Sequence, residues 1–409
     1  MKRTARDNRP YVRPVERIEL DEKHLGRRAL AVAILLVIAG ISVIYGLVNL
    51  TKAQKGWNVI EVNSSSQYHC GNEFTFLYDL GYGEIDATSE KKSLVLLYTD
   101  LCMKEQMIYD NDQEYEGTVN IRTLNEHPNE TLTVDPNLYR ALEKIQTCDS
   151  RYPYLGPVYD TYDYVFFYDD LNDIYEYDPH VNEQLHAEFL EILSYASDPE
   201  HIRIELLGND RVVLRVSEEY ERFHKEKGLR SYFDLYWMKN AFIIDDIADT
   251  LIDSGFINGT IASNDGIAVR NLGGVKEDFL LNVYDRRDSS YYQAAVYRYQ
   301  GKRSFISLRS FPMYEDDRYI TALENGEVRS AYLSIRDVLN HYAYKSLTVY
   351  GSSAGCSDLL LKTAPVFLGD GEGDLGTYFA VNGNTIYTND PAAVFEELYQ
   401  DYQVKEVGK

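Results

Sequence analysis

The chain has 409 residues, with 65 acidic and 41 basic side chains and a formal net charge of −24. Such a surface repels the phosphates of nucleic acids, so we expect no nucleic-acid partner. The 36 tyrosines favour a domain with many strands and half-buried aromatic faces.

The first fifty residues predict a membrane anchor. Residues 29–48 contain no charge and, at about 1.5 Å per residue, cover a hydrocarbon core of about 30 Å. Nine Lys or Arg precede this run, whereas only two follow it closely, so the N-terminus should be cytoplasmic. We therefore expect a cytoplasmic segment 1–28, a transmembrane helix 29–50, a tether 51–69 and an extracytoplasmic domain 70–409 of a single-pass cell-membrane protein.

A cleaved signal peptide is the alternative reading of this run. Its apolar region would span about 7 to 15 residues and end at a small-residue cleavage site. The present run is longer and ends in Tyr45, Leu47 and Asn49. These features favour an uncleaved signal-anchor that contacts the lipid bilayer.

All four cysteines lie on the predicted exported side, where disulfides persist: Cys70, Cys102, Cys148 and Cys356. Their wide spacing resembles no zinc-ligand pattern. Two disulfides, one or none are all compatible with the sequence.

Periodicity predicts a domain that alternates helices and strands. Helices are expected at Ser89–Tyr109, Pro136–Gln146, Asn182–Ser197, Leu235–Ser254, Ser357–Leu368 and Pro391–Tyr402, with Thr88 or Ser89, Asp135, Asp234 and Asp390 as caps. Strands are expected at 202–208, 211–216, 259–263, 266–271, 278–285, 291–299, 304–310, 346–351 and 377–388. The expected fold class is α/β of the α+β type, with a mixed, mostly antiparallel sheet and flanking helices in one domain.

The segment 351–355 reads Gly-Ser-Ser-Ala-Gly between a predicted strand and a predicted helix. A nucleophile elbow has this setting, and an esterase would use Ser353. The catalytic His of that fold follows the Ser, however, and no His follows His341. A serine esterase is therefore a minor alternative.

Other polar clusters favour structural roles. His180 and His186 are six residues apart without an acidic partner at metalloprotease spacing, so no zinc site is assigned. The acid pairs Asp245–Asp246 and Asp316–Asp317 are explained as solvated charges or helix caps.

The segment 115–125, YEGTVNIRTLN, resembles the "Y-x-G-x-x-N-I-x-T-[IL]-N" motif of the FAD:protein FMN transferases, the ApbE-type flavin transferases. The resemblance covers about residues 70–395, in the membrane-anchored form common to Gram-positive bacteria. It implies Mg²⁺-dependent transfer of FMN from FAD to a Thr or Ser of an exported acceptor protein, and it assigns Tyr115 to cofactor binding.

A second segment is similar to the family's "D-L-G-G-I-A-K-G-Y-x-x-D". Asp234 and Asp245 keep the spacing, but Tyr236–Trp237 replaces Gly-Gly and Asn240 stands at the Lys position. The resemblance assigns Asp234 and Asn240 to cofactor binding. In 260–266 the Gly-Gly of "N-L-G-G-D" is likewise replaced.

The last similar segments are 329–337, which lacks the His and Asp of the family, and 357–364, which resembles "A-D-A-L-A-T-A-L". The resemblance assigns Asp358 and Thr363 to Mg²⁺. The family's Asp and Thr are four residues apart, whereas these are five apart and lie about 140° from each other around a helix.

Two hypotheses stay open. An active flavin transferase would use FAD as substrate with Mg²⁺ and modify an exported acceptor or a membrane redox complex. A catalytically silent, membrane-anchored relative would instead bind a flavin or a partner as a scaffold. No catalytic residue is assigned.

Overall fold

The computed structural model describes residues 52–407, except 84, 167–173, 288–289, 314–316, 397 and 400. The predicted cytoplasmic segment and transmembrane helix lie outside these residues. Residues 54–407 belong to one compact unit. In the described part of the chain, no helix is long and apolar enough to cross a membrane.

A nine-stranded sheet in the described residues organises the fold, in the order β1-β2-β6-β7-β10-β13-β14-β15-β17. Its strands are β1 (Gly56–Ile60), β2 (Phe74–Leu80), β6 (Gly259–Ser263), β7 (Ala268–Asn271), β10 (Arg303–Arg309), β13 (Ser346–Gly351), β14 (Thr377–Asn382), β15 (Thr385–Thr388) and β17 (Gln403–Glu406). Neighbours pair antiparallel except β15 with β17. The predicted mixed, mostly antiparallel sheet with flanking helices is confirmed.

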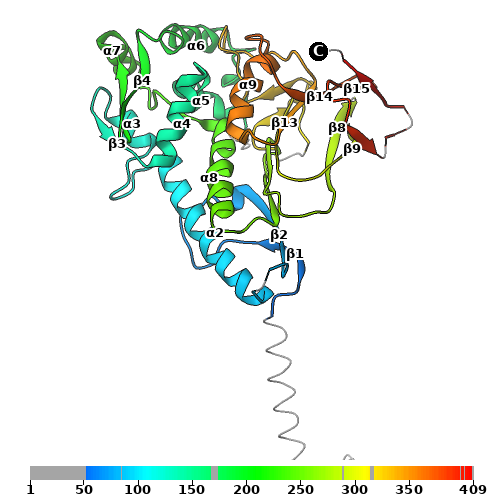
Figure 1. The fold of residues 1–409 in the computed structure, drawn as a ribbon. Helices are drawn as coiled ribbons and strands as arrows, with labels where there is room; N and C mark the ends of the chain where they lie inside the picture. Colours follow the sequence, from blue (N-terminus) through cyan, green and yellow to red (C-terminus); the bar gives the residue numbers. More distant parts are fainter. Residues whose placement is uncertain are drawn as a thin grey trace, which may run out of the picture. The chain divides into compact units, whose positions relative to one another are not determined.

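Three helices pack against this sheet: α2 (Ala87–Tyr109), α8 (Lys239–Asp253) and α9 (Cys356–Leu368). α2 contacts β1 and β2, α8 contacts β6 and β7, and α9 contacts β10 and β13. α8 also contacts α2 and α9 and lies between them (Figure 1). Its residues from Asn240 to Ala248 are all buried, so any polar side chain among them needs a partner inside the protein.

A second layer is the three-stranded sheet of β8 (Phe279–Arg287), β9 (Ser290–Tyr299) and β16 (Val394–Glu396). Tyr297 and Tyr299 of β9 pack with Phe305, Tyr350 and Phe379 of the main sheet. These tyrosines are buried in the core, whereas the sequence predicted half-buried aromatic faces.

A helical region with a small sheet completes the fold. Its helices are α3 (Ile121–Glu126), α4 (Pro136–Thr147), α5 (Gly156–Tyr162), α6 (Glu183–Ala196) and α7 (Glu218–Lys227), and its sheet has β3 (Leu132–Thr133), β4 (Ile202–Gly208) and β5 (Arg211–Val216). Short elements are η1 (Gly71–Glu73), η2 (Tyr152–Leu155), η3 (Asp163–Val165), η4 (Ile174–Glu176), η5 (Tyr236–Met238) and the hairpin β11 (Ile320–Ala322) with β12 (Val328–Ser330).

Several sequence predictions are wrong. The cap of α2 is Asp86, which accepts hydrogen bonds from Thr88 N and Ser89 N, and not Thr88 or Ser89. Part of the expected tether 51–69 is β1, whose residues pair with β2 along the edge of the main sheet. The expected helix Pro391–Tyr402 is instead a turn followed by β16, because Phe395 packs on Tyr297 with ring centroids 5.4 Å apart. Asp390 accordingly caps no helix and accepts hydrogen bonds from Ala392 N and the Tyr350 hydroxyl.

Candidate functional site

A cavity of about 770 Å³ opens beside the N-terminus of α8. Residues of η1, α2, α5, η5 and α8 line it, together with the segments 110–112, 264–265 and 317–319. Eight of its lining side chains are acidic: Glu73, Asp110, Asp112, Asp160, Asp163, Asp234, Asp265 and Asp317. We call it the acidic cavity, and its volume suits a small-molecule ligand.

Three basic side chains line the same cavity and neutralise part of the charge. Arg230 pairs with Asp160 at 2.7 Å and Asp112 at 2.9 Å, and Arg318 pairs with Asp163 at 2.8 Å. The third is Lys239, which lies 3.9 Å from Glu73. Eight acids against three bases leave a formal charge of −5 on the lining when every acid is ionised.

Asn240 is the most constrained of the lining residues. Its side chain is 3 % exposed, and its Nδ2 donates to Asp265 Oδ2 at 2.9 Å and to Glu73 Oε2 at 3.1 Å. Its Oδ1 is buried and has no hydrogen-bond partner in the described residues. A buried acceptor without a donor costs stability, but this oxygen is closed to water, so a ligand could reach it only if the side chains that cover it moved.

Asp234 belongs to the same family-like segment as Asn240 and also lines the acidic cavity. Its Oδ1 accepts a hydrogen bond from Tyr236 N at 2.9 Å. Burial raises the pKa of Asp234 to about 6, and the Asp160 and Asp112 carboxylates raise it further against the effect of Lys239. A carboxyl with a displaced pKa in a cavity is a functional-site candidate.

Tyr236 has an unusual backbone conformation, at a position where the family resemblance expects glycine. Its φ is +40°, in the left-handed region that a side chain disfavours. The ring stacks on Tyr159 with centroids 4.8 Å apart, and the hydroxyl donates to Asp163. These contacts hold the strained residue in the wall of the acidic cavity.

Tyr115 does not line the acidic cavity with Asp234 and Asn240. Its hydroxyl donates to Asp110 Oδ2 at 2.7 Å, so it supports a lining residue from behind. Burial and the bond to Asp110 raise the pKa of Tyr115 to about 12. The structure therefore brings together two of the three predicted cofactor residues.

The two predicted metal ligands have separate partners, and neither lines the acidic cavity. Asp358 Oδ1 lies 3.1 Å from Lys144 Nζ, and its Oδ2 accepts from Gly355 N at 3.0 Å. Thr363 is fully buried, and its hydroxyl donates to Leu359 O at 2.7 Å. In the described residues, no group of three or more His, Cys, Asp or Glu side chains could hold a metal ion. The assignment of these two residues to Mg²⁺ stays a prediction.

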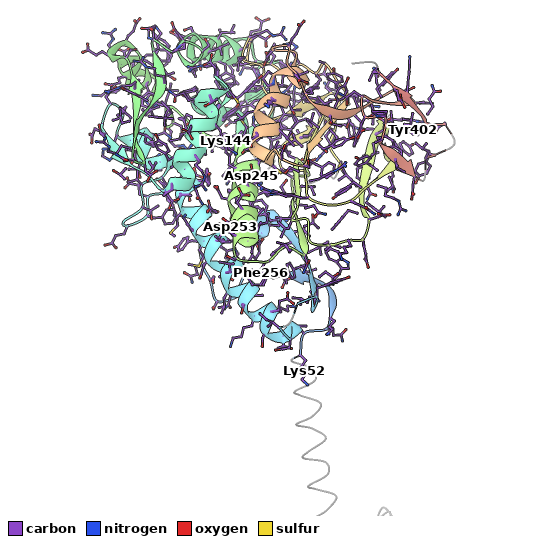
Figure 2. All side chains as sticks on the ribbon, viewed as in Figure 1. Lys52, Lys144, Asp245, Asp253, Phe256 and Tyr402 are labelled. Atoms are coloured by element: carbon purple, nitrogen blue, oxygen red, sulfur yellow. The ribbon has the colours of Figure 1, made fainter. Side chains whose placement is uncertain are left out.

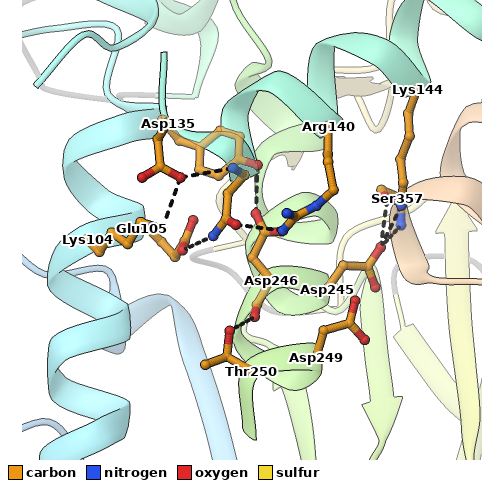
Figure 3. A network of polar contacts seen from close by, with 12 residues as sticks. Lys104, Glu105, Asp135, Arg140, Lys144, Asp245, Asp246, Asp249, Thr250 and Ser357 are labelled. Atoms are coloured by element: carbon orange, nitrogen blue, oxygen red, sulfur yellow. Dashed lines mark hydrogen bonds and ion pairs between the residues drawn. The ribbon is translucent and has the colours of Figure 1, made fainter. Parts of the chain in front are cut away.

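Asp245 ties α8 to the N-terminus of α9, as Figure 3 shows. Its Oδ2 accepts from Ser357 N at 2.9 Å and from the Ser357 hydroxyl at 2.6 Å, and its Oδ1 accepts from Cys356 N at 2.8 Å. A Cβ at Gly355 would lie 2.3 Å from this carboxylate, so the approach requires glycine. Figure 2 places Asp245 and Lys144 near each other in the middle of the domain, and Lys144 Nζ lies 3.7 Å from Asp245 Oδ2.

The acid pair Asp245–Asp246 is buried rather than solvated. Asp245 accepts from the first backbone N–H groups of α9, which agrees with the helix-cap interpretation of this pair. Asp246 accepts from the Tyr109 hydroxyl at 2.8 Å. It also accepts from Arg140 at 3.2 Å (Figure 3). Burial raises the pKa of Asp246 to about 6. Of the second acid pair, Asp316 lies outside the described residues, and Asp317 pairs with Arg309 at 2.9 Å.

Ser353 lies in the expected turn between β13 and α9, exposed to solvent. Every His in the described residues pairs elsewhere; His180 accepts from Asn340 N at 3.1 Å, and His186 contacts Asp337 O at 3.0 Å. The esterase reading therefore has no base beside its nucleophile. The four cysteines are free, and Cys70 Sγ lies 3.3 Å from Cys102 O.

Sequence reasoning missed Asp265 and Tyr319 as lining residues. A signal for Asp265 existed, because it replaces a glycine of the family in 260–266. Tyr319 belongs to no motif that the sequence shows. Only the fold brings it near Glu73, Asp265 and Asp234.

No protein-family model and no curated protein sequence matches this chain. Among solved structures, the ApbE protein of Thermotoga maritima has a TM-score of 0.53 and 13% identity, over 83% of this chain and 97% of that one. The flavin transferase ApbE from Vibrio cholerae (TM-score 0.49, 13% identity, 81% and 95% covered) and the flavinyl transferase ApbE of Pseudomonas stutzeri (0.46, 9%, 85% and 96%) are also similar. The likeness to the Thermotoga protein shows that the described domain has the ApbE fold.

Proposed function

We propose that this chain is a catalytically silent protein with the flavin-transferase fold, which holds a ligand in the acidic cavity. The observation that carries this proposal is that both predicted metal ligands on α9, Asp358 and Thr363, already have partners within the protein. The ammonium of Lys144 neutralises Asp358, and the Thr363 hydroxyl is used by its own helix. Transfer of FMN would need Mg²⁺ to neutralise the pyrophosphate of FAD, and these two oxygens do not converge on a common point.

The residues of the acidic cavity also fit FAD poorly. The pyrophosphate is anionic, and the lining carries a formal charge of −5 when its acids are ionised. The two N–H groups of the Asn240 amide, which could have reached a phosphate, already bond to Glu73 and Asp265. Two cations of the lining, Arg230 and Arg318, are paired with acids. We therefore derive no reaction step through FAD or Mg²⁺.

The cellular setting belongs to the same proposal. The uncharged run 29–48 and the basic residues before it support a single-pass anchor, with the domain on the extracytoplasmic side. A protein held there could serve an exported protein or a membrane redox complex as a ligand-binding scaffold. The net charge of −24 argues against a nucleic-acid partner.

An active flavin transferase is the second candidate, supported by the family-like segment 115–125 and by the fold. One experiment separates the two. The full-length protein in a nonionic detergent is mixed with FAD and a Thr-containing acceptor peptide, with and without Mg²⁺, and AMP is measured. The silent reading predicts AMP at the level of the protein-free control. Mg²⁺-dependent AMP release that is lost in Asp358→Ala would establish the transferase instead.

A further inference from the structure

We infer that the acidic cavity binds an organic cation that presents a primary ammonium group. The inference rests on the proposed function, because it names the class of ligand for the same cavity. It starts from the disagreement between an anionic dinucleotide and a lining with more acids than bases.

The hydrogen-bonding capacity of the innermost wall favours a ligand that donates. The Asn240 amide must point its Nδ2 toward Glu73 and Asp265, since the reverse orientation would set its oxygen against two carboxylates. Oδ1 is then left as a buried acceptor without a donor. An ammonium group has three N–H donors and no acceptor, so it suits a lining with more carboxylates than cations and can bond to more than one carboxylate.

Asp234 supplies the complementary charge. The only hydrogen bond to its carboxylate within the described residues comes from Tyr236 N. The neighbouring acids Asp160 and Asp112 disfavour its ionised form, and a bound cation would relieve that repulsion. A charged donor facing this carboxylate forms a stronger hydrogen bond than a neutral one.

Aromatic rings complete the wall. Tyr159, Tyr236 and Tyr319 all line the acidic cavity. The guanidinium of Arg318 already lies over two of these rings, 5.6 Å from the centroid of Tyr236 and 5.0 Å from that of Tyr319. Aromatic rings that already contact one cation in a partly desolvated wall can also pack against the alkyl chain and the ammonium group of a bound amine.

An ammonium group fits this lining better than a divalent metal ion. A metal ion needs several carboxylates that converge at short distance, and no group of three metal-binding side chains occurs in the described residues. The acidic cavity, of about 770 Å³, instead has room for an extended organic molecule.

The test is calorimetric titration of the full-length protein in a nonionic detergent at pH 7.5 and low salt. The probe is cadaverine, and the matched control is 1,5-pentanediol, which has the same chain and no charge. We expect cadaverine to bind and the diol to bind at least about tenfold more weakly. Equal binding of the two probes, or no binding of cadaverine, would overturn the inference, and this comparison needs no variant to fold.

The residue assignment is tested with Asp234→Asn and with Asp253→Asn, an exposed acid at the other end of α8. Cadaverine affinity should fall about tenfold in the first and stay unchanged in the second. Equal affinity in both would overturn the role of Asp234. A third probe, N-acetyl-lysine methylamide, identifies the source: tighter binding than cadaverine indicates a lysine side chain of a polypeptide, and weaker binding a free diamine.

Failure of this inference is distinguishable from failure of the proposed function. AMP release from FAD is measured in the same preparation. A preparation that releases AMP contradicts catalytic silence, whatever binds. One that neither releases AMP nor binds cadaverine contradicts only the identity of the ligand.

Discussion

The side-chain amide of Asn240 donates a hydrogen bond of 2.9 Å to Asp265 Oδ2, and this contact decides which end of the amide is left unpaired. Glu73 takes the other N–H at 3.1 Å. Oδ1 is left buried and unpaired, and the acidic lining residues, Asp234 among them, give the acidic cavity an excess of acceptors over donors.

Replacement of Asn240 by Leu should destabilise the protein. The buried Asp265 would lose a donor while keeping its bonds to Ser263 and Ile267 N, so we expect a loss of about 1–2 kcal/mol. Urea unfolding followed by tryptophan fluorescence measures this loss. The control is Asn325→Leu in the exposed turn between β11 and β12, where a change below about 0.5 kcal/mol is expected. Equal losses in both variants would show that the Asn240 amide has no special role.

Asp234→Asn should stabilise the protein at neutral pH while it weakens the binding of amines. The pKa of Asp234 rises from 3.8 to about 6 on folding, so the native state holds a proton that the unfolded state releases between these values. Stability is therefore lost as pH rises from about 4 to 6, by about 1–3 kcal/mol in total. Asparagine does not titrate.

The variant should accordingly match the wild type near pH 4 and exceed it at pH 7.5, as thermal unfolding at the two pH values would show. Cadaverine affinity of the wild type should rise with pH through about 6, as Asp234 ionises. A variant that is less stable than the wild type at pH 7.5 would contradict the burial argument.

Asp245→Ala should be the most damaging of the single substitutions considered. It leaves three hydrogen-bond donors at the start of α9 unsatisfied and removes one of the two carboxylates that pair with Arg270. We therefore expect the free energy of unfolding to fall by about 3–5 kcal/mol. Asp249→Ala is the matched control, because Asp249 is on the same helix and pairs with the same Arg270 but its side chain is 58% exposed. We expect the control to lose less than about 1 kcal/mol in urea unfolding. Similar losses for the two would refute the role of Asp245 as the link between α8 and α9.

Lys362→Thr restores the four-residue spacing between Asp358 and a threonine on an exposed position of α9. We expect no Mg²⁺-dependent AMP release, because Lys144 still occupies Asp358 and the acidic cavity still repels the pyrophosphate. The double variant Lys144→Ala/Lys362→Thr should also be silent. Turnover in either variant, measured as AMP, would show that only the metal position separates this chain from an active transferase.

The regular elements could be predicted from local pattern. The helix Pro136–Thr147 begins where expected, since Asp135 accepts a hydrogen bond from Asn137 N and Pro136 occupies the first helical position. The strand Ser346–Gly351 alternates between the helix-covered and the aromatic face. The helix predicted at Pro391–Tyr402 is wrong because the apolar spacing there fits both a helix and a strand. Only the contact of Phe395 with Tyr297 selects the strand.

The candidate site was predictable only in part. Asp234 and Asn240 were found because they occupy positions in a recognisable frame. The excess of acidic over basic side chains in the acidic cavity could not be found in that segment. These acids come from parts of the sequence as distant as Glu73 and Asp317. Lys144 likewise lies on α4, far in sequence from Asp358, and only the packing of α4 on α9 brings them to 3.1 Å.

The most direct test of the account is a crystal structure of the full-length protein grown with both cadaverine and FAD with Mg²⁺ in excess. We predict an amine nitrogen about 3 Å from a carboxylate oxygen of Asp234, with no flavin in the acidic cavity. A flavin dinucleotide in that cavity, with Mg²⁺ against Asp358, would contradict the account.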